Sequence, residues 1–332
     1  MPGDIPLSSL TVSKLLDETV DKCGDRIAFI SVHQGISKSY TDFRHEVAKL
    51  ASGFISLGLR KGDRIGLCCP NCYEWPLTQY AAAKAGLILV NINPVSEPME
   101  LDYCLKKVGC KALVTWDIFK TQNFYNILCE IIPELSKSTS CRLKSSNGIL
   151  NISDVIESGN KESDEILSSI EKSIQFDDPV NIQYTSGTTG KPKGAVISHH
   201  NIINNVLITC KNRLSSAEPS LTKLRCLHPS LFLPGVSVVI TPHYISVPVH
   251  SYLRNPTMLI DCLNSLQLQK YDISSLNQVI IGGSAITENL LKDLKNLLKL
   301  STVTAAYGST ENGPVVAVNG VDENFEKASK DF

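Results

Sequence analysis

The stretch that bears most directly on the fold reads Val180-Asn-Ile-Gln-Tyr-Thr-Ser-Gly-Thr-Thr-Gly-Lys-Pro-Lys-Gly-Ala-Val-Ile-Ser198. Its two apolar runs, Val180 to Tyr184 and Gly194 to Ser198, have the length and composition of short β-strands. The eleven residues from Tyr184 to Gly194 contain three glycines, four small hydroxyl residues and two lysines. Glycines let backbone N–H groups turn toward an anion, hydroxyls donate hydrogen bonds and lysine adds a positive charge. The stretch therefore predicts a phosphate-binding loop between two strands.

This loop differs from the common P-loop of nucleotide-binding proteins. That motif, Gly-x-x-x-x-Gly-Lys-Ser/Thr, opens a helix, whereas here Gly190-Lys191 is followed by Pro192 and then by a strand. The plain alternative is a flexible linker rich in Gly and Thr. The two lysines and the apolar strands on both sides argue against a linker.

Strand and helix patterns alternate on both sides of the loop. A helical pattern begins at Thr41, the expected N-cap, and ends at Gly58, the expected C-cap. The other predicted helices are 75–85, 99–108, 200–210 and 287–300, and the other predicted strands are 64–69, 87–92, 112–115, 276–281 and 302–306. Strands that alternate with helices of this length indicate a parallel sheet covered on both faces. The predicted fold class is α/β.

The composition changes between Ser136 and Ser173, where eleven serines fall within 38 residues. We expect a polar surface connection there, extending to about residue 178. It either separates two lobes or is a long insertion within one sheet.

Composition and charge exclude several classes of protein. With 332 residues, 42% hydrophobic and 20% charged, the chain can bury a sizeable core, which excludes disorder, collagen and coiled coil. The longest apolar candidate, Leu231 to Ile240, is short and contains Pro234, so no transmembrane segment and a soluble protein are expected. A net charge of −1 without a basic block argues against nucleic-acid binding.

Eleven cysteines raise the question of a metal or disulfide site. Cys69-Pro-Asn-Cys72 has the inner spacing of a zinc or redox pair, but no second pair and no histidine lies at ligand spacing. Reduced thiols in the core are the favoured interpretation, over a metal site or an extracellular disulfide framework.

Two motifs resemble those of the adenylate-forming (AMP-binding) superfamily, which includes acyl-CoA synthetases, luciferases and the adenylation domains of peptide synthetases. Tyr184 to Gly194 looks like its phosphate-loop signature, and Ala306-Tyr-Gly-Ser-Thr-Glu311 is similar to its Tyr-Gly-x-Thr-Glu element. The resemblance runs from about Leu10 to Glu311 and is strongest to the mitochondrial medium-chain acyl-CoA ligases of the acyl-CoA synthetase family. The stretches most alike are Lys61–Arg64, Met99–Cys110 and Asn255–Met258.

The resemblance implies the N-terminal domain of an adenylate-forming enzyme, α/β with mostly parallel sheets covered by helices. It implies a ligase that uses ATP, Mg²⁺ and coenzyme A. The carboxylate of a fatty acid attacks the α-phosphorus of ATP to give an acyl-adenylate and pyrophosphate, and the thiol of coenzyme A then displaces AMP. Both steps depend on positioning and electrostatics rather than on a protein nucleophile.

The resemblance also assigns roles to residues. Contacts to the β- and γ-phosphates would come from Thr185, Ser186, Gly187, Thr188, Thr189, Gly190, Pro192 and Lys193, and less strongly from Lys191, which stands where the family varies. Among these, Thr188 and Lys193 are expected to be catalytic, together with Thr310 and Glu311.

The second motif would hold the rest of the nucleotide. Glu311 would bind Mg²⁺ with phosphate oxygens, Thr310 would bond the α-phosphate, and Tyr307 would lie against the adenine beside Gly308 and Ser309. A wall shared by adenine and acyl chain would be formed by Gly282, Gly283 and Ser284. Ala285-Ile286, which follows that wall, departs from the proline-rich pattern of the family.

Other departures reduce the expected activity. The family's Pro-x-x-His-x-x-Gly element of the acyl tunnel has no counterpart in Leu227 to Gly235, so His228 is expected to be a bystander, and a shorter gap falls between His250 and Asn255. Only 21 residues follow Glu311. The family's ribose-binding aspartate, hinge and mobile C-terminal domain would lie beyond them. We therefore expect residues 1–332 to form a partial AMP-binding domain with impaired activity.

Three questions stay open at the level of sequence. The chain is either a fatty acyl-CoA ligase, a non-catalytic ATP-binding module, or an aryl or amino-acid adenylating ligase. The resemblance indicates the mitochondrial matrix, whereas the N-terminal residues lack the pattern of a presequence and would leave the protein in the cytoplasm. The oligomeric state is not predicted.

Overall fold

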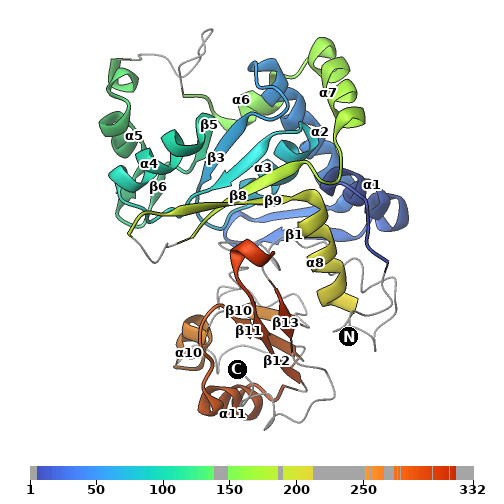
Figure 1. Cartoon of the computed structure of the whole chain (residues 1–332), viewed down its shortest axis with the longest axis vertical. Coiled ribbons are helices and arrows are strands. Elements are labelled where there is room, and N and C mark those ends of the chain that lie inside the picture. Colours follow the sequence, from blue (N-terminus) through green and yellow to red (C-terminus); the bar gives the residue numbers. More distant parts are fainter. Residues whose placement is uncertain are drawn as a thin grey trace. The chain divides into compact units, whose positions relative to one another are not determined.

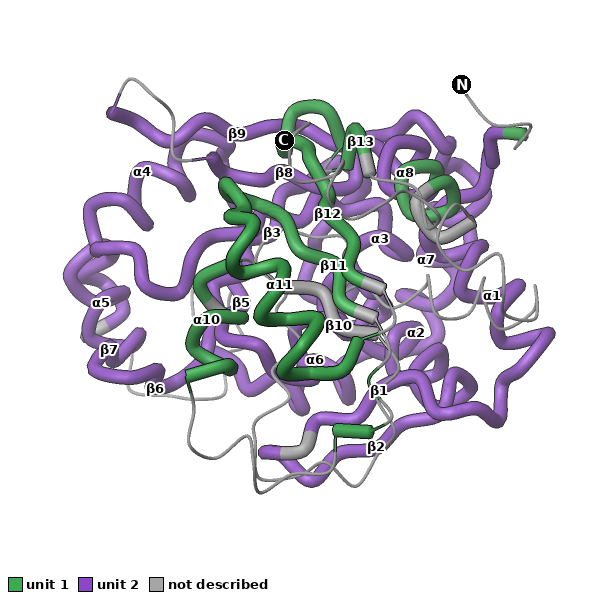
Figure 2. The backbone as a smooth tube through the Cα atoms, turned by 90° about the horizontal axis from the view of Figure 1, so that it is seen from below, with its two compact units in different colours: residues 1–6, 204–332 green, residues 7–203 purple. Residues whose placement is uncertain are grey.

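The computed structural model describes residues 6–137, 149–185, 190–211, 251–254, 256–264, 273–274, 276, 278–300, 302–313 and 315–318. The chain forms two compact units, one of residues 7–203 and one of residues 1–6 with 204–332 (Figures 1 and 2). The boundary between them falls inside helix α8 (His199–Lys211) rather than in the serine-rich stretch.

The unit of residues 7–203 is built on a five-stranded sheet with the order β5-β3-β4-β8-β9. Strands β3 (Arg64–Cys68), β4 (Ile88–Asn91), β5 (Cys110–Thr115) and β8 (Pro179–Thr185) run parallel to one another. Strand β9 (Lys193–Ser198) pairs antiparallel with β8, because the short loop between them leaves no room for a crossover helix. The predicted α/β class with a mostly parallel sheet is confirmed.

Helices cover both faces of this sheet (Figure 1). On one face, Leu101 of α4 (Pro98–Val108) and Phe124 of α5 (Phe124–Ile131) are buried together with Val90 and Ile182 of the strands. Successive side chains of a strand alternate between faces, so the neighbours of Val90 point to the opposite side. There α3 (Glu74–Lys84) contacts β3 and β4, and α2 (Tyr40–Ser56) packs on α3.

The remaining elements of this unit complete its surface. They are α1 (Val12–Cys23), the hairpin of β1 (Ile27–Ser31) and β2 (Ile36–Ser39), the 3-10 turns η1 (Val32–Gln34) and η2 (Pro133–Lys137), the short pair β6 (Ile118–Phe119) and β7 (Gln122–Asn123), α6 (Ile152–Glu157) and α7 (Lys161–Ser173). No described helix is long and apolar enough to cross a bilayer.

Helix α2 begins at a different cap from the one the sequence predicted. Ser39 is the N-cap: its hydroxyl accepts the Asp42 N–H at 3.1 Å, and the Asp42 carboxylate accepts the Ser39 N–H at 3.3 Å. This reciprocal capping box makes the prediction of Thr41 wrong, since Thr41 lies inside the helix. Gly58 lies just beyond the last turn with φ +93°, as predicted for a helix end.

The serine-rich stretch contains two helices rather than an extended connection. Asn151 and Asn160 cap α6 and α7, each accepting a backbone N–H at 3.0 Å. Both helices contact α2 and bury Val155 and Leu167. Because the stretch joins β5 to β8 of one sheet, it is an insertion within that sheet, the second of the two alternatives.

The unit of residues 204–332 contains a four-stranded sheet with the order β10-β11-β12-β13. Strands β10 (Ser251–Arg254), β11 (Gln278–Gly282) and β12 (Thr302–Tyr307) are parallel, and β13 (Ala317–Val318) is antiparallel to β12. Val279, Ile281 and Val303 of this sheet are buried with Leu259 of α10 (Pro256–Asn264) and with Leu290 and Leu294 of α11 (Glu288–Leu297).

A buried histidine joins α1 to the end of β9 within the first unit. The Nδ1 atom of His199 accepts the Val12 N–H at 3.1 Å, and the His199 backbone N–H donates to the Asp178 carbonyl at 3.3 Å. The side chain is 1% exposed. Burial lowers the pKa of His199 to about 4; Asp178 opposes this shift and Lys61 adds to it, both more weakly. A proton on Nδ1 would break the bond to Val12, so the ring is neutral in the fold.

We expect the stability of this unit to fall as the pH drops from about 6.5 to about 4, because the unfolded state then binds a proton that the folded state excludes. The full effect corresponds to about 3 kcal/mol, at about 1.4 kcal/mol for each unit of pKa difference. Both tryptophans, Trp75 and Trp116, lie in residues 7–203, so urea unfolding followed by tryptophan fluorescence reports on this unit.

His199→Gln is the matched variant, since its amide oxygen can still accept the Val12 N–H but does not titrate. The variant should lose most of the decline between pH 6.5 and 4. An unchanged pH dependence in His199→Gln would contradict the assignment to His199.

Candidate nucleotide-binding site

The predicted phosphate loop is a hairpin on β8 and β9. Thr185 pairs with Lys193 and Tyr184 pairs with Gly194, so the two strands hold the ends of the loop side by side. The Thr185 hydroxyl donates to the Lys193 carbonyl at 3.5 Å. Gly190 is exposed with φ +97°, a backbone conformation that favours glycine. The tip itself, Ser186, Gly187, Thr188 and Thr189, lies outside the described residues.

Helix α4 anchors the base of this hairpin. The Tyr184 hydroxyl donates to the Cys104 carbonyl at 2.7 Å, and burial raises the pKa of Tyr184. The Lys191 Nζ lies 5.5 Å from the centre of the Tyr103 ring, within reach of a cation–π contact. Lys193 is exposed, as Lys191 is, and forms no ion pair within the described part of the chain. The two lysines differ in that Lys191 lies over the Tyr103 ring.

A row of buried polar side chains leads to the hairpin and was missed by the sequence analysis. Asn181, Gln183 and Thr185 alternate along β8 and so share one face, and Asn91 of β4 pairs with Gln183. The amides of Asn91 and Asn181 and the Gln183 Nε2 are buried and have no hydrogen-bond partner among the described residues. The only sequence signal is the pattern of polar residues within otherwise apolar strands.

Asn181 offers a direct test, since both its side-chain polar atoms lack a hydrogen-bond partner in the part of the chain that the structure describes and the residue is 1% exposed. Asn181→Leu should raise the free energy of unfolding by about 2 kcal/mol, because it removes buried polar atoms that have lost their water. The same exchange at the α7 cap, Asn160→Leu, should lower it by about 1 kcal/mol. Urea unfolding measures both. Destabilisation by Asn181→Leu would contradict this account and would mean that bound water supplies partners for the amide.

The other predicted residues lie at one edge of the second sheet. Gly282 ends β11 and is followed by Gly283 and Ser284, and Tyr307 ends β12 and is followed by Gly308 to Glu311, at the carboxyl ends of two neighbouring parallel strands. Gly282 pairs with Ala306, and a Cβ on Gly282 would lie 2.6 Å from the Ala306 carbonyl oxygen, so only glycine fits. This edge is where open α/β sheets bind their ligands.

The side chains at this edge face outward. Tyr307 is 62% exposed, and Gly308 and Ser284 are exposed as well. Ser309 precedes the 3-10 turn η5 (Thr310–Asn312), in which Thr310 is half-buried and the Glu311 side chain is exposed. The structure thus brings Gly282–Ser284 and Tyr307–Glu311 together at one edge of this sheet. The phosphate hairpin belongs to the other unit.

Glu311 fits Mg²⁺ as a single protein ligand. No group of three or more His, Cys, Asp or Glu side chains arranged around a metal occurs in the described ranges. Mg²⁺ commonly takes one or two carboxylates and completes its octahedron with phosphate oxygens and water. Glu311 would therefore hold Mg²⁺ together with a nucleotide.

The Cys69–Cys72 pair is part of the core. The two sulfur atoms lie 3.9 Å apart, with the Cys72 thiol donating to Cys69 Sγ, and both residues are free and buried. The hydrogen bond from Cys72, followed by burial, raises the pKa of Cys69. Burial also raises the pKa of Cys68 and of Cys104 to about 12. Neutral buried thiols of this kind are poor nucleophiles.

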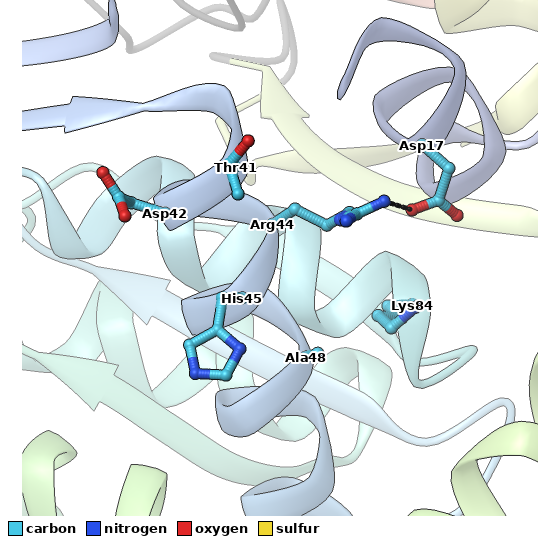
Figure 3. Close-up of a pocket in the computed structure, with 7 residues that line it drawn as sticks. All are labelled: Asp17, Thr41, Asp42, Arg44, His45, Ala48 and Lys84. Carbon is cyan, nitrogen blue, oxygen red and sulfur yellow. Dashed lines mark ion pairs between the residues drawn. The ribbon is translucent and has the colours of Figure 1, made fainter. Parts of the chain in front are cut away.

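A cavity of about 410 Å³ lies elsewhere in the first unit, among α1, α2 and α3 (Figure 3). It is lined by Asp17, Thr41, Asp42, Arg44, His45, Ala48 and Lys84. Three of its charged residues form ion pairs within the fold: Arg44 Nη1 lies 3.9 Å from Asp17 Oδ1, and Lys84 pairs with Glu171. Burial, more than any neighbouring charge, raises the pKa of Asp17. No residue of the predicted nucleotide site lines this cavity.

Comparison with known proteins places the chain in a family. The family model described as AMP-binding enzyme matches residues 16–330, so the chain belongs to the AMP-binding enzyme family. It is 37% identical over 365 residues to the mitochondrial medium-chain acyl-CoA ligase ACSF2 of Bos taurus, and 35% identical over 366 residues to that of Homo sapiens. Each alignment covers 98% of this chain and 59% of the relative. The chain thus spans about 59% of the length of these relatives.

Solved structures share the fold. A long-chain-fatty-acid-CoA ligase, FadD1 of Archaeoglobus fulgidus, has a TM-score of 0.74 at 23% identity, covering 98% of this chain and 69% of that one. The N-terminal domain of FACL13 from Mycobacterium tuberculosis has a TM-score of 0.71 at 18% identity, covering 96% and 80%. The chain has the fold of the N-terminal domain of adenylate-forming enzymes.

Some predicted features cannot be placed. The altered tunnel element from Leu227 to Gly235, with His228, lies outside the described residues, as do His250 and Asn255.

Proposed function

We propose that this chain binds ATP with Mg²⁺ and activates a fatty acid as its acyl-adenylate, the first half-reaction of an acyl-CoA ligase. The observation that carries the proposal is the Tyr184–Gly194 hairpin, with Lys193 exposed where β8 and β9 meet the loop. Membership of the AMP-binding family and identity to acyl-CoA ligases support the reaction class.

In this proposal the protein positions charge and does not act as a nucleophile. A carboxylate oxygen of the acid forms a bond to the α-phosphorus of ATP, and the bond from that phosphorus to pyrophosphate breaks. Lys193 and the loop hydroxyls, including Thr188, stabilise the charge that passes to pyrophosphate, and Thr310 bonds the α-phosphate. In the second half-reaction the thiol of coenzyme A attacks the acyl carbonyl, AMP leaves and the thiol proton passes to water.

The acyl group and the compartment follow the relatives. Their names specify medium-chain acids and the mitochondrion, and we extend both to this chain.

Calorimetry with ATP and Mg²⁺ tests the nucleotide site. Lys193→Met should weaken ATP binding about tenfold or more, because a charge-assisted hydrogen bond to phosphate is lost. Lys191→Met is the matched control and should have a smaller effect, because that lysine lies over Tyr103. Glu311→Gln should remove the gain in affinity that Mg²⁺ gives the wild-type protein. Equal losses in the two lysine variants would contradict the assignment of Lys193.

Exchange of labelled pyrophosphate into ATP, driven by octanoate, tests the chemistry. We expect octanoate-dependent exchange that Lys193→Met abolishes. Binding of ATP without exchange would favour a non-catalytic module, and exchange driven only by benzoate or an amino acid would favour an aryl or amino-acid adenylating ligase.

A further inference from the structure

Asn205 makes an unusual set of contacts within the unit of residues 204–332. It lies in the middle of α8 and is half-buried. Its Nδ2 donates to the backbone carbonyls of Gly313 and Val315, the latter at 2.6 Å. Its Oδ1 accepts the Val315 N–H at 3.3 Å. One side-chain amide therefore bonds three backbone groups of a single segment.

These contacts imitate those of a backbone strand. The Asn205 amide offers one donor and one acceptor to Val315, as a neighbouring peptide group would in a sheet. The additional bond to Gly313 reaches the residue where η5 ends, which is buried and has φ +73°. The side chain thus fixes both the turn at Gly313 and the residues that follow it.

The segment held in this way carries the predicted Mg²⁺ ligand. The Val316 N–H donates to the Tyr307 carbonyl at 2.8 Å, and Tyr307 pairs with Ala317, so residues 307–317 form a closed loop on β12 and β13. Glu311 lies at the far end of this loop, in η5. Asn205 binds Gly313 and Val315, which lie between Glu311 and β13.

We propose that Asn205 is a positioning residue, which fixes the loop bearing Thr310 and Glu311 so that the Glu311 carboxylate is in place for nucleotide-bound Mg²⁺. The proposal rests on the proposed role of Glu311. Without Asn205, the segment from Gly313 to Val315 loses all three side-chain bonds, while the backbone bonds from Gly313 to Thr310 and from Val316 to Tyr307 remain. A carboxylate on a loosened loop must be ordered when the ion binds, which weakens binding.

Hydrogen–deuterium exchange tests whether Asn205 holds the loop. In Asn205→Ala, the Val315 amide should exchange about tenfold faster, since it loses its acceptor. Asn201→Ala is the matched control: it removes the same amide one turn earlier on α8, where the Oδ1 atom has no hydrogen-bond partner among the described residues. Unchanged exchange across residues 308–318 in Asn205→Ala, or an equal rise in Asn201→Ala, would overturn the proposal.

Calorimetry with a double-mutant cycle then tests the link to Mg²⁺. Asn205→Ala should reduce the gain in ATP affinity given by Mg²⁺ and leave Mg²⁺-free binding close to wild type. Combined with Glu311→Gln it should cause no further loss, because both changes remove the same contribution. An equal loss with and without Mg²⁺, or additive losses in the double variant, would identify a purely structural residue and overturn the proposal.

The experiments can contradict the proposed function and the role of Asn205 separately. A wild-type protein that binds no ATP, or a Glu311→Gln variant that keeps the full Mg²⁺ effect, contradicts the proposed function and with it the ligand-positioning role of Asn205. Faster exchange at Val315 in Asn205→Ala would then still show that Asn205 holds the loop. Normal ATP and Mg²⁺ binding by wild type with no Mg²⁺-specific change in Asn205→Ala contradicts only the inference about Asn205.

Discussion

Parallel strands end at a common edge of their sheet, and this constraint places the candidate residues at the ends of β8, β11 and β12. In the first unit it sets the phosphate hairpin at the carboxyl end of β8, next to the end of β4. In the second it sets Gly282 beside Ala306, so that Gly283 and Gly308 follow the ends of two neighbouring strands. The chemistry of the site therefore depends on strand register. A register shift of one residue would turn Thr185 and Lys193 to the opposite face of the sheet.

Much of the fold could be predicted because its signals are local. The helix at 98–108 ends where Gly109 takes φ +63°, and the strand at 64–68 is an apolar run between a turn and a proline. The N-cap of α2 could not be predicted from the local sequence, since Ser39 and Thr41 both have side chains that can cap a helix. Helices α6 and α7 contact α2 and bury Val155 and Leu167. The serine-rich composition of this stretch gives no indication of that burial.

The same distinction applies to the site. The residues of the two motifs were predicted because their types and spacing resemble those of a family with known chemistry. The supporting contacts were not, because they join distant parts of the chain. Asn205 and Val315 are 110 positions apart, and Tyr184 and Cys104 are 80 apart. No periodicity in the sequence indicates that the Tyr184 hydroxyl bonds a carbonyl of α4, or that an asparagine of α8 holds the Glu311 loop.

The central claim is that this chain uses its phosphate hairpin to form an acyl-adenylate. Mass spectrometry of a single-turnover mixture of the protein, ATP, Mg²⁺, octanoate and pyrophosphatase tests it most directly. The account predicts octanoyl-adenylate with the wild-type protein and none with Lys193→Met. A wild-type protein that binds ATP but forms no adenylate with octanoate or with other fatty acids would contradict it.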